Sequence, residues 1–132
     1  MGTPKNNVIL VVDDHEDIAD LVKGQLLRDG YNVHGFYDPL VALDYFEENY
    51  KKIALVITDV RMPSMSGIEL VSRIKEIKQD VKAILISAFE RDTIDDEINR
   101  YNVKIEEVVQ KPFSLNNLAK SVKDILLKND VG

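Results

Sequence analysis

Short apolar runs alternate with longer amphipathic stretches along the whole chain. The runs that predict strands are Val8–Val12, Tyr31–Gly35, Ala54–Ile57, Ala83–Ile86 and Val108–Val109. Four of the five consist mainly of Val, Ile or Leu without polar alternation, which is typical of parallel strands covered on both faces. The second run alternates polar and apolar residues, so we expect it at an edge of the sheet.

Apolar residues recur at helical spacing between these runs and predict five helices. The first has Asp14 as N-cap and stops at Gly30, the second starts at Pro39, the third spans 67–78, the fourth 92–101, and the fifth runs from its N-cap Ser114 to about Lys128. Strict alternation of strands and helices predicts an α/β domain with a parallel sheet between two helical layers.

The 132 residues are the length of one domain. We place its bounds at residues 5–128 and expect no second domain, because we find no repeat, linker or low-complexity tract. The chain has 23 acidic and 17 basic residues, a net charge of −6 and no cysteine. This charge disfavours direct binding to nucleic acid or a membrane. Without cysteine there are no disulfides and no thiolate metal sites, which suits a cytoplasmic location.

Ligands of open parallel sheets bind at the carboxyl ends of the strands, so the residues that follow each strand are the candidates for chemistry. These are Asp13 and Asp14 after the first strand, Asp59 after the third, Ser87 after the fourth and Lys111 after the fifth. Three carboxylates close together repel each other unless a cation or a proton compensates them, and an oxygen-only set that shares its site with a phosphate favours Mg²⁺. A hydroxyl and an ammonium beside them suit a transferred phosphoryl group, with Asp59 as the nucleophile.

Each of these residues also has an ordinary structural interpretation. An acidic pair before a helix is often only an N-cap, an aspartate or serine often only ends a strand, and a lysine is usually a solvated surface residue. Their joint placement at four strand ends favours the functional interpretation.

Four motifs carry a resemblance to a known family, namely VILVVDD, VITDVRMPSMSGIEL, AILISA and VVQKPF. Together they resemble the receiver domain of the response regulators of two-component signalling, including the chemotaxis regulators, over nearly the whole chain. The resemblance implies a flavodoxin-like fold with five parallel strands in the order 2-1-3-4-5, five helices and three layers. It implies a phosphoacceptor switch rather than an enzyme, one that catalyses only its own phosphorylation and dephosphorylation.

The resemblance also implies roles for individual residues. Asp59 corresponds to the phosphoacceptor, which receives the phosphoryl group from a histidine kinase or a histidine phosphotransfer protein. Mg²⁺ would be held by Asp13, Asp14, Asp59 and the backbone carbonyl of Arg61. Ser87 matches the switch hydroxyl and Lys111 the cation that pairs with the phosphoryl group, aimed by a cis peptide before Pro112. The signal would pass to a downstream protein or to an output domain that this chain lacks.

The chain departs from the family pattern at positions near the switch hydroxyl and the phosphoryl group. Val108 stands where the family usually has the Tyr or Phe of the switch. Phe89, two residues after Ser87, either packs against the fourth helix or, together with Arg61, restricts the access of water to the phosphoryl group. We expect His15 at the surface of the first turn, and we assign no role to His34.

Two rival functions stay open from the sequence. A phosphatase of the haloacid dehalogenase type also uses a strand-end aspartate, but it needs a second Asp two residues later, where this chain has His15 or Glu16. A nucleotide- or flavin-binding module would need a glycine- or hydroxyl-rich loop after the first strand, where the acidic DDHED stands. The chain could also be a stand-alone regulator or the receiver of a longer transcription factor or hybrid kinase.

Overall fold

The computed structural model describes residues 8–131, with side chains from 8 to 127, so residues 5–7 of the predicted domain lie outside it. Strands and helices alternate as predicted, with one short 3₁₀ helix before the third strand. In chain order they are β1 (Val8–Val12), α1 (Glu16–Arg28), β2 (Asn32–Phe36), α2 (Pro39–Asn49), η1 (Tyr50–Lys52), β3 (Ile53–Asp59), α3 (Gly67–Ile77), β4 (Lys82–Ser87), α4 (Arg91–Tyr101), β5 (Glu107–Gln110) and α5 (Leu115–Val131).

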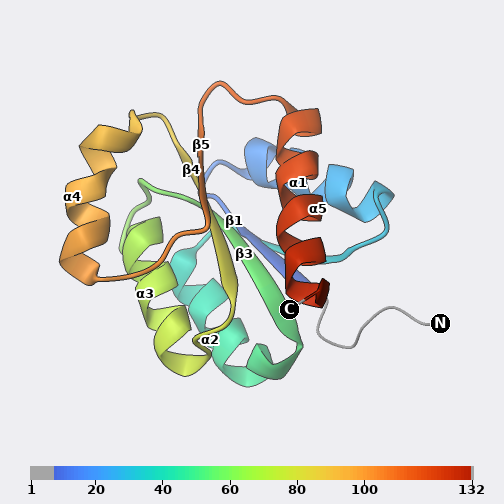
Figure 1. Cartoon of the computed structure of the whole chain (residues 1–132), viewed down its shortest axis with the longest axis horizontal. Helices are drawn as coiled ribbons and strands as arrows, with labels where there is room; N and C mark the ends of the chain where they lie inside the picture. Colours follow the sequence, from blue (N-terminus) through green and yellow to red (C-terminus); the bar gives the residue numbers. More distant parts are fainter. Residues whose placement is uncertain (1–7, 132) are drawn as a thin grey trace.

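The strands form one parallel sheet in the order β2-β1-β3-β4-β5. The predicted fold class, flavodoxin-like with three layers, is therefore confirmed, and the alternating second strand lies at an edge. In Figure 1, α1 and α5 lie on one side of the sheet and α2, α3 and α4 on the other. This topology brings the carboxyl ends of β1, β3 and β4 side by side.

Two apolar cores flank the sheet because successive side chains of a strand point to opposite faces. Ile9 and Val11 of β1 pack with α1 and α5, whereas Leu10 and Val12 pack with α2, α3 and α4. Every residue of β3 is buried, as expected for the central strand of a covered sheet. The buried central strand of the sheet thus ends at Asp59.

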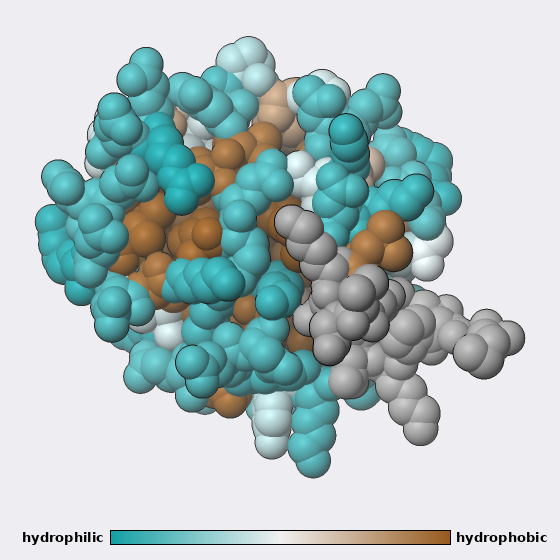
Figure 2. Space-filling view, viewed as in Figure 1, coloured by the Kyte–Doolittle hydropathy of each residue, from teal (hydrophilic) through white to brown (hydrophobic). Residues whose placement is uncertain are grey.

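The edge formed by β5 is more open. Its residues are only partly buried, and Gln110 is exposed. Figure 2 shows a mainly hydrophilic face on which apolar surface is visible between α4 and β5. Among the described residues, no helix has an apolar stretch long enough to cross a membrane.

The first helix begins differently from its prediction. Its N-cap is His15 and not Asp14, and its first residue is Glu16. The prediction was wrong because the carboxylate of Asp13 accepts a hydrogen bond from the His15 backbone N–H at 2.9 Å, which leaves Asp14 in the loop above β1. The predicted stop at Gly30 is confirmed, since this residue follows the C-cap Asp29 and has a φ of +96°.

The start of the last helix agrees with its prediction. The Ser114 hydroxyl accepts a hydrogen bond from the Asn117 backbone N–H at 3.0 Å, as an N-cap does. The fourth helix begins one residue earlier than predicted, at Arg91, and ends at Tyr101 as predicted, followed by its C-cap Asn102 in a left-handed conformation. Only Ile94 and Ile98 of α4 are buried, so its apolar stripe is as thin as the sequence predicts.

Candidate functional site

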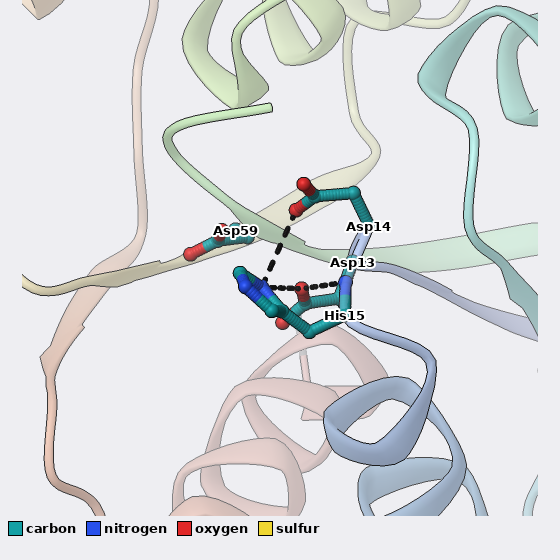
Figure 3. Close-up of side chains that lie close together, drawn as sticks. All are labelled: Asp13, Asp14, His15 and Asp59. Carbon is teal, nitrogen blue, oxygen red and sulfur yellow. Dashed lines mark hydrogen bonds and ion pairs between the residues drawn. The ribbon is translucent and has the colours of Figure 1, made fainter. Parts of the chain in front are cut away.

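Three acidic side chains meet at the carboxyl edge of the sheet. Asp13 and Asp14 follow β1, and Asp59 ends the neighbouring β3 (Figure 3). One possible ligand atom from each of these residues and from His15 lies within 4.8 Å of the others. Asp13 is 2% exposed and Asp59 is 5% exposed. Two of the three acidic side chains are therefore almost completely removed from water.

The carboxylates lack enough partners for their charge. Asp13 Oδ2 and Asp14 Oδ1 are buried and accept no hydrogen bond. Burial raises the pKa of Asp13, and the negative charge of Asp59 raises it further, against the lowering effects of the His15 backbone N–H and of Lys111. Buried oxygens of this kind, all from carboxylates, fit a hard divalent cation such as Mg²⁺. The residues present therefore fit the predicted metal.

His15 lies closer to this cluster than the sequence suggests. Its side chain is 67% exposed, as expected of a first-turn residue, but Nδ1 lies 3.4 Å from Asp13 Oδ1 and 3.5 Å from Asp14 Oδ1. Figure 3 shows the imidazole turned toward the carboxylates. His34 lies away from the site on β2, where its ring packs 5.0 Å from that of Tyr45.

A lysine that follows the edge strand β5 places a positive charge beside the carboxylates. Lys111 Nζ lies 3.1 Å from Asp59 Oδ1, and the Lys111–Pro112 peptide is cis, as expected. The Lys111 backbone N–H donates to the carbonyl of Ser87 at 2.7 Å, which ties the end of β5 to the end of β4. Asp59 is thus both the acidic group nearest to this ammonium and a member of the carboxylate cluster.

The fold brings Ser87 to the same edge of the sheet. Ser87 is completely buried at the end of β4, beside Ile86, which pairs with Asp59 in the sheet register. Its hydroxyl donates to the Phe89 carbonyl at 3.0 Å and accepts from the Phe89 backbone N–H at 2.9 Å. In this conformation the hydroxyl is engaged by the loop that follows β4.

A family model for the response regulator receiver domain matches residues 9–123. The chain belongs to the response regulator receiver family. Its 31% identity to the uncharacterized transcriptional regulatory protein YkoG of Bacillus subtilis extends over 92% of this chain and 51% of YkoG. This receiver thus spans about half the length of several curated relatives that it matches.

Solved structures agree with this assignment. A receiver domain protein from Clostridium thermocellum superposes with a TM-score of 0.83 at 27% identity, over 95% of this chain and 98% of that one. The response regulator TrrA of Thermotoga maritima, solved in complex with Mg(2+)-BeF, has a TM-score of 0.77 at 32% identity, over 90% of this chain and 98% of that one.

Phe89 lies near Ser87 and contacts Arg61, the residue with which one of its two predicted roles pairs it. This side chain is 43% exposed, and the Arg61 guanidinium lies over its ring, 5.3 Å from the centroid. Arg61 Nη1 also lies 3.2 Å from Glu97 Oε1 on α4. Val108 is half-buried and packs against the core between the sheet and α2, α3 and α4. The link from Arg61 to Glu97 was not predicted, because a separation of 36 residues leaves no local signal.

Removing one charge from the acidic cluster is expected to stabilise the metal-free receiver. Asp13→Asn keeps an oxygen that can accept the His15 N–H but removes a buried, under-compensated charge. We expect the free energy of unfolding to rise by about 1 kcal/mol without metal, and its increase on adding Mg²⁺ to be largely lost. Urea unfolding with and without Mg²⁺ measures both effects.

The matched control is Asp44→Asn, on the exposed face of α2. This change is expected to alter neither the metal-free stability nor the response to Mg²⁺. A destabilised Asp13→Asn variant that responds to Mg²⁺ like the wild type would contradict the role of Asp13.

Proposed function

We propose that this receiver accepts a phosphoryl group on Asp59 from the phosphohistidine of a histidine kinase or histidine phosphotransfer protein, in a reaction that depends on Mg²⁺. The observation that carries the proposal is the position of Asp59, which is buried within the carboxylate cluster and paired with Lys111 at 3.1 Å. Such a carboxylate is shielded from water and lies beside a cation, as a nucleophile for a phosphoryl group would need. Within the predicted bounds, residues 5–128, the chain would work as one receiver unit.

The transfer forms one bond and breaks one. A carboxylate oxygen of Asp59 attacks phosphorus in line, the bond from phosphorus to the donor's imidazole nitrogen breaks, and the leaving imidazole keeps the electron pair and takes up a proton. The product is an acyl phosphate on Asp59. A bound Mg²⁺ would neutralise charge on the phosphoryl oxygens, and the residues that would hold it are Asp13, Asp14, Asp59 and the backbone carbonyl of Arg61.

Lys111 and Ser87 act on the same phosphoryl oxygens. The Lys111 ammonium, which pairs with the free carboxylate, would pair with the phosphoryl oxygens after transfer. The new dianion would attract the Ser87 hydroxyl away from the Phe89 backbone. This movement would alter the β4–α4 loop and α4, and thereby the surface that a downstream protein or an output domain binds.

A groove beside the site fits the surface of a phosphodonor protein. It has a volume of about 460 Å³ and a mainly apolar lining formed by Ile18, Leu21, Lys111, Pro112, Phe113 and Leu115. Leu21 is 56% exposed on α1. An apolar surface next to the acceptor would hold the donor's helix while its histidine reaches Asp59.

The groove predicts a difference between protein and small-molecule donors. Leu21→Gln is expected to slow transfer from a phosphorylated histidine phosphotransfer protein about ten-fold, because an exposed apolar anchor is lost. Transfer from acetyl phosphate, which needs no docking surface, serves as the internal reference. Leu27→Gln is the control, since Leu27 is 47% exposed on the same helix but lies outside the groove. Equal slowing by both variants, or with both donors, would contradict this docking site.

The experiment that tests the proposed function compares acceptor and phosphatase behaviour. Purified protein is incubated with Mg²⁺ and labelled acetyl phosphate, and stable incorporation is measured alongside the turnover of a generic phosphate ester. We expect stoichiometric, hydroxylamine-labile labelling in the wild type, none in Asp59→Asn, and no sustained ester hydrolysis. Continuous ester turnover would instead favour the haloacid dehalogenase alternative, and labelling of Asp59→Asn would refute the assignment.

The proposed context is a two-component pathway. This receiver would catalyse only its own phosphorylation and dephosphorylation. It would act in the cytoplasm, where the kinase obtains its phosphoryl group from ATP. The receiver of a longer transcription factor or hybrid kinase would have the same site, because the chemistry uses residues of this chain alone.

A further inference from the structure

The proposed switch requires the Ser87 hydroxyl to leave two hydrogen bonds. It donates to the carbonyl of Phe89 and accepts from the backbone N–H of the same residue, at 3.0 and 2.9 Å. Both bonds close a tight turn. The hydroxyl can therefore move toward Asp59 only when its two hydrogen bonds to the Phe89 backbone break. Whatever holds Phe89 in place therefore also opposes the movement of Ser87.

Phe89 is held by a side chain from the acceptor strand's own loop. The Arg61 guanidinium lies over the Phe89 ring, 5.3 Å from its centroid, in the geometry of a cation–π contact. Arg61 follows Asp59 by two residues. A residue next to the proposed acceptor thus contacts the loop that engages the switch hydroxyl.

The same guanidinium also forms an ion pair with a residue of α4. Its Nη1 lies 3.2 Å from Glu97 Oε1, and the Glu97 side chain is only 18% exposed on α4. Among the described side chains, two hydrogen bonds join α4 to other parts of the chain, this one and the bond from Tyr101 to Glu69 at 3.4 Å. Because only two side chains of α4 are buried, the Arg61 contact adds to a small number of contacts that hold this helix.

We propose that Arg61 is a positioning residue that holds the Ser87 hydroxyl in its resting position, by clamping the Phe89 loop against Glu97 of α4. The inference rests on the proposed function, since Ser87 needs a phosphoryl group to move toward. The clamp makes the resting state more stable and opposes phosphorylation. It also couples α4 to Ser87 from the β3 side of β4, whereas Val108 lies on β5 at the other side of that strand.

The clamp is tested by the affinity for beryllofluoride, which mimics a phosphoryl group on a carboxylate, measured by calorimetry with saturating Mg²⁺. Removing the clamp lowers the cost of moving Ser87, so binding becomes tighter. We expect about five-fold tighter binding in Arg61→Gln and about three-fold tighter binding in Glu97→Gln and in Phe89→Leu. The double variant of Arg61 and Glu97 should bind no more tightly than Arg61→Gln alone, because both changes release the same guanidinium.

The matched control is Arg91→Gln. Arg91 is 57% exposed, close to the 53% of Arg61, and it pairs with Asp95 within helix α4, whereas the cation–π contact to Phe89 comes from Arg61. We expect its affinity for beryllofluoride to equal that of the wild type. An equal gain in Arg91→Gln would mean that loosening α4 in general is responsible, and it would overturn the clamp.

A second background shows whether Arg61 acts through the hydroxyl. In Ser87→Ala, the substitution Arg61→Gln should no longer change the affinity, whereas an effect on water access or on the metal site would persist. Unchanged or weaker binding in Arg61→Gln, or a gain that persists in Ser87→Ala, would overturn the inference. A wild type that fails to bind beryllofluoride with Mg²⁺ would instead refute the proposed function.

Discussion

Gly67→Ala is expected to destabilise the receiver by about 3 kcal/mol and to slow its phosphorylation about ten-fold or more. A Cβ at this position would lie 2.0 Å from the Asp59 carbonyl oxygen and 3.0 Å from Thr58 Cγ2. Neither group can yield easily, because Thr58 is buried and its hydroxyl donates to that carbonyl at 2.9 Å. The added methyl group must therefore push the first turn of α3 away from Asp59 or rotate the backbone of Asp59 itself.

Gly24→Ala is the control for this prediction. Gly24 lies within α1, and the nearest atom to an added Cβ is the flexible end of Arg28 at 3.8 Å. Alanine is the better helix former, so we expect this variant to be more stable by about 0.5–1 kcal/mol. Urea unfolding and the rate of labelling by acetyl phosphate measure both effects. A Gly67→Ala protein with wild-type stability would contradict the close packing of α3 on Asp59.

Lys111→Ala is expected to slow phosphoryl transfer to Asp59 about 100-fold, because a fixed cation at the reacting group is lost. Its Nζ lies 3.1 Å from Asp59 Oδ1, and its side chain is 25% exposed. Part of the ammonium's hydration shell is therefore replaced by the carboxylate, which strengthens its effect on developing charge. The labelling rate at saturating Mg²⁺ separates this loss from weaker metal binding.

Lys120→Ala is the control for Lys111→Ala. Lys120 is exposed on α5, so its removal changes the net charge equally without touching the site. We expect its labelling rate to match that of the wild type. If both variants were slowed alike, the effect would come from the overall charge of the receiver and not from a cation at Asp59.

The strands and the edge of the sheet at which the site lies could be predicted from the residue pattern, whereas the order of the strands was implied by the family resemblance. Strands buried on both faces consist of uninterrupted Val, Ile and Leu, and in a parallel sheet their carboxyl ends face the same way. Asp13, Asp14 and Asp59 were placed together on this ground, and they meet within 4.8 Å. The link from Lys111 to Asp59 follows from the same rule.

What could not be predicted depends on contacts that form only in the folded chain. The N-cap of α1 is His15 and not Asp14 because the Asp13 carboxylate accepts a hydrogen bond from the His15 backbone N–H. The pairing of Arg61 with Glu97 joins residues that are far apart in the chain. The need for glycine at position 67 arises from the Asp59 carbonyl, which only the folded backbone brings there.

The central claim is that Asp59 itself receives the phosphoryl group. The most direct measurement is borohydride reduction of the protein after incubation with Mg²⁺ and acetyl phosphate, followed by peptide mass spectrometry. Borohydride reduces an acyl phosphate to an alcohol and leaves a free carboxylate unchanged, so the modified residue is identified by position. We predict reduction at Asp59 alone, dependent on Mg²⁺. Reduction at Asp13 or Asp14, or none at any residue, would contradict the account.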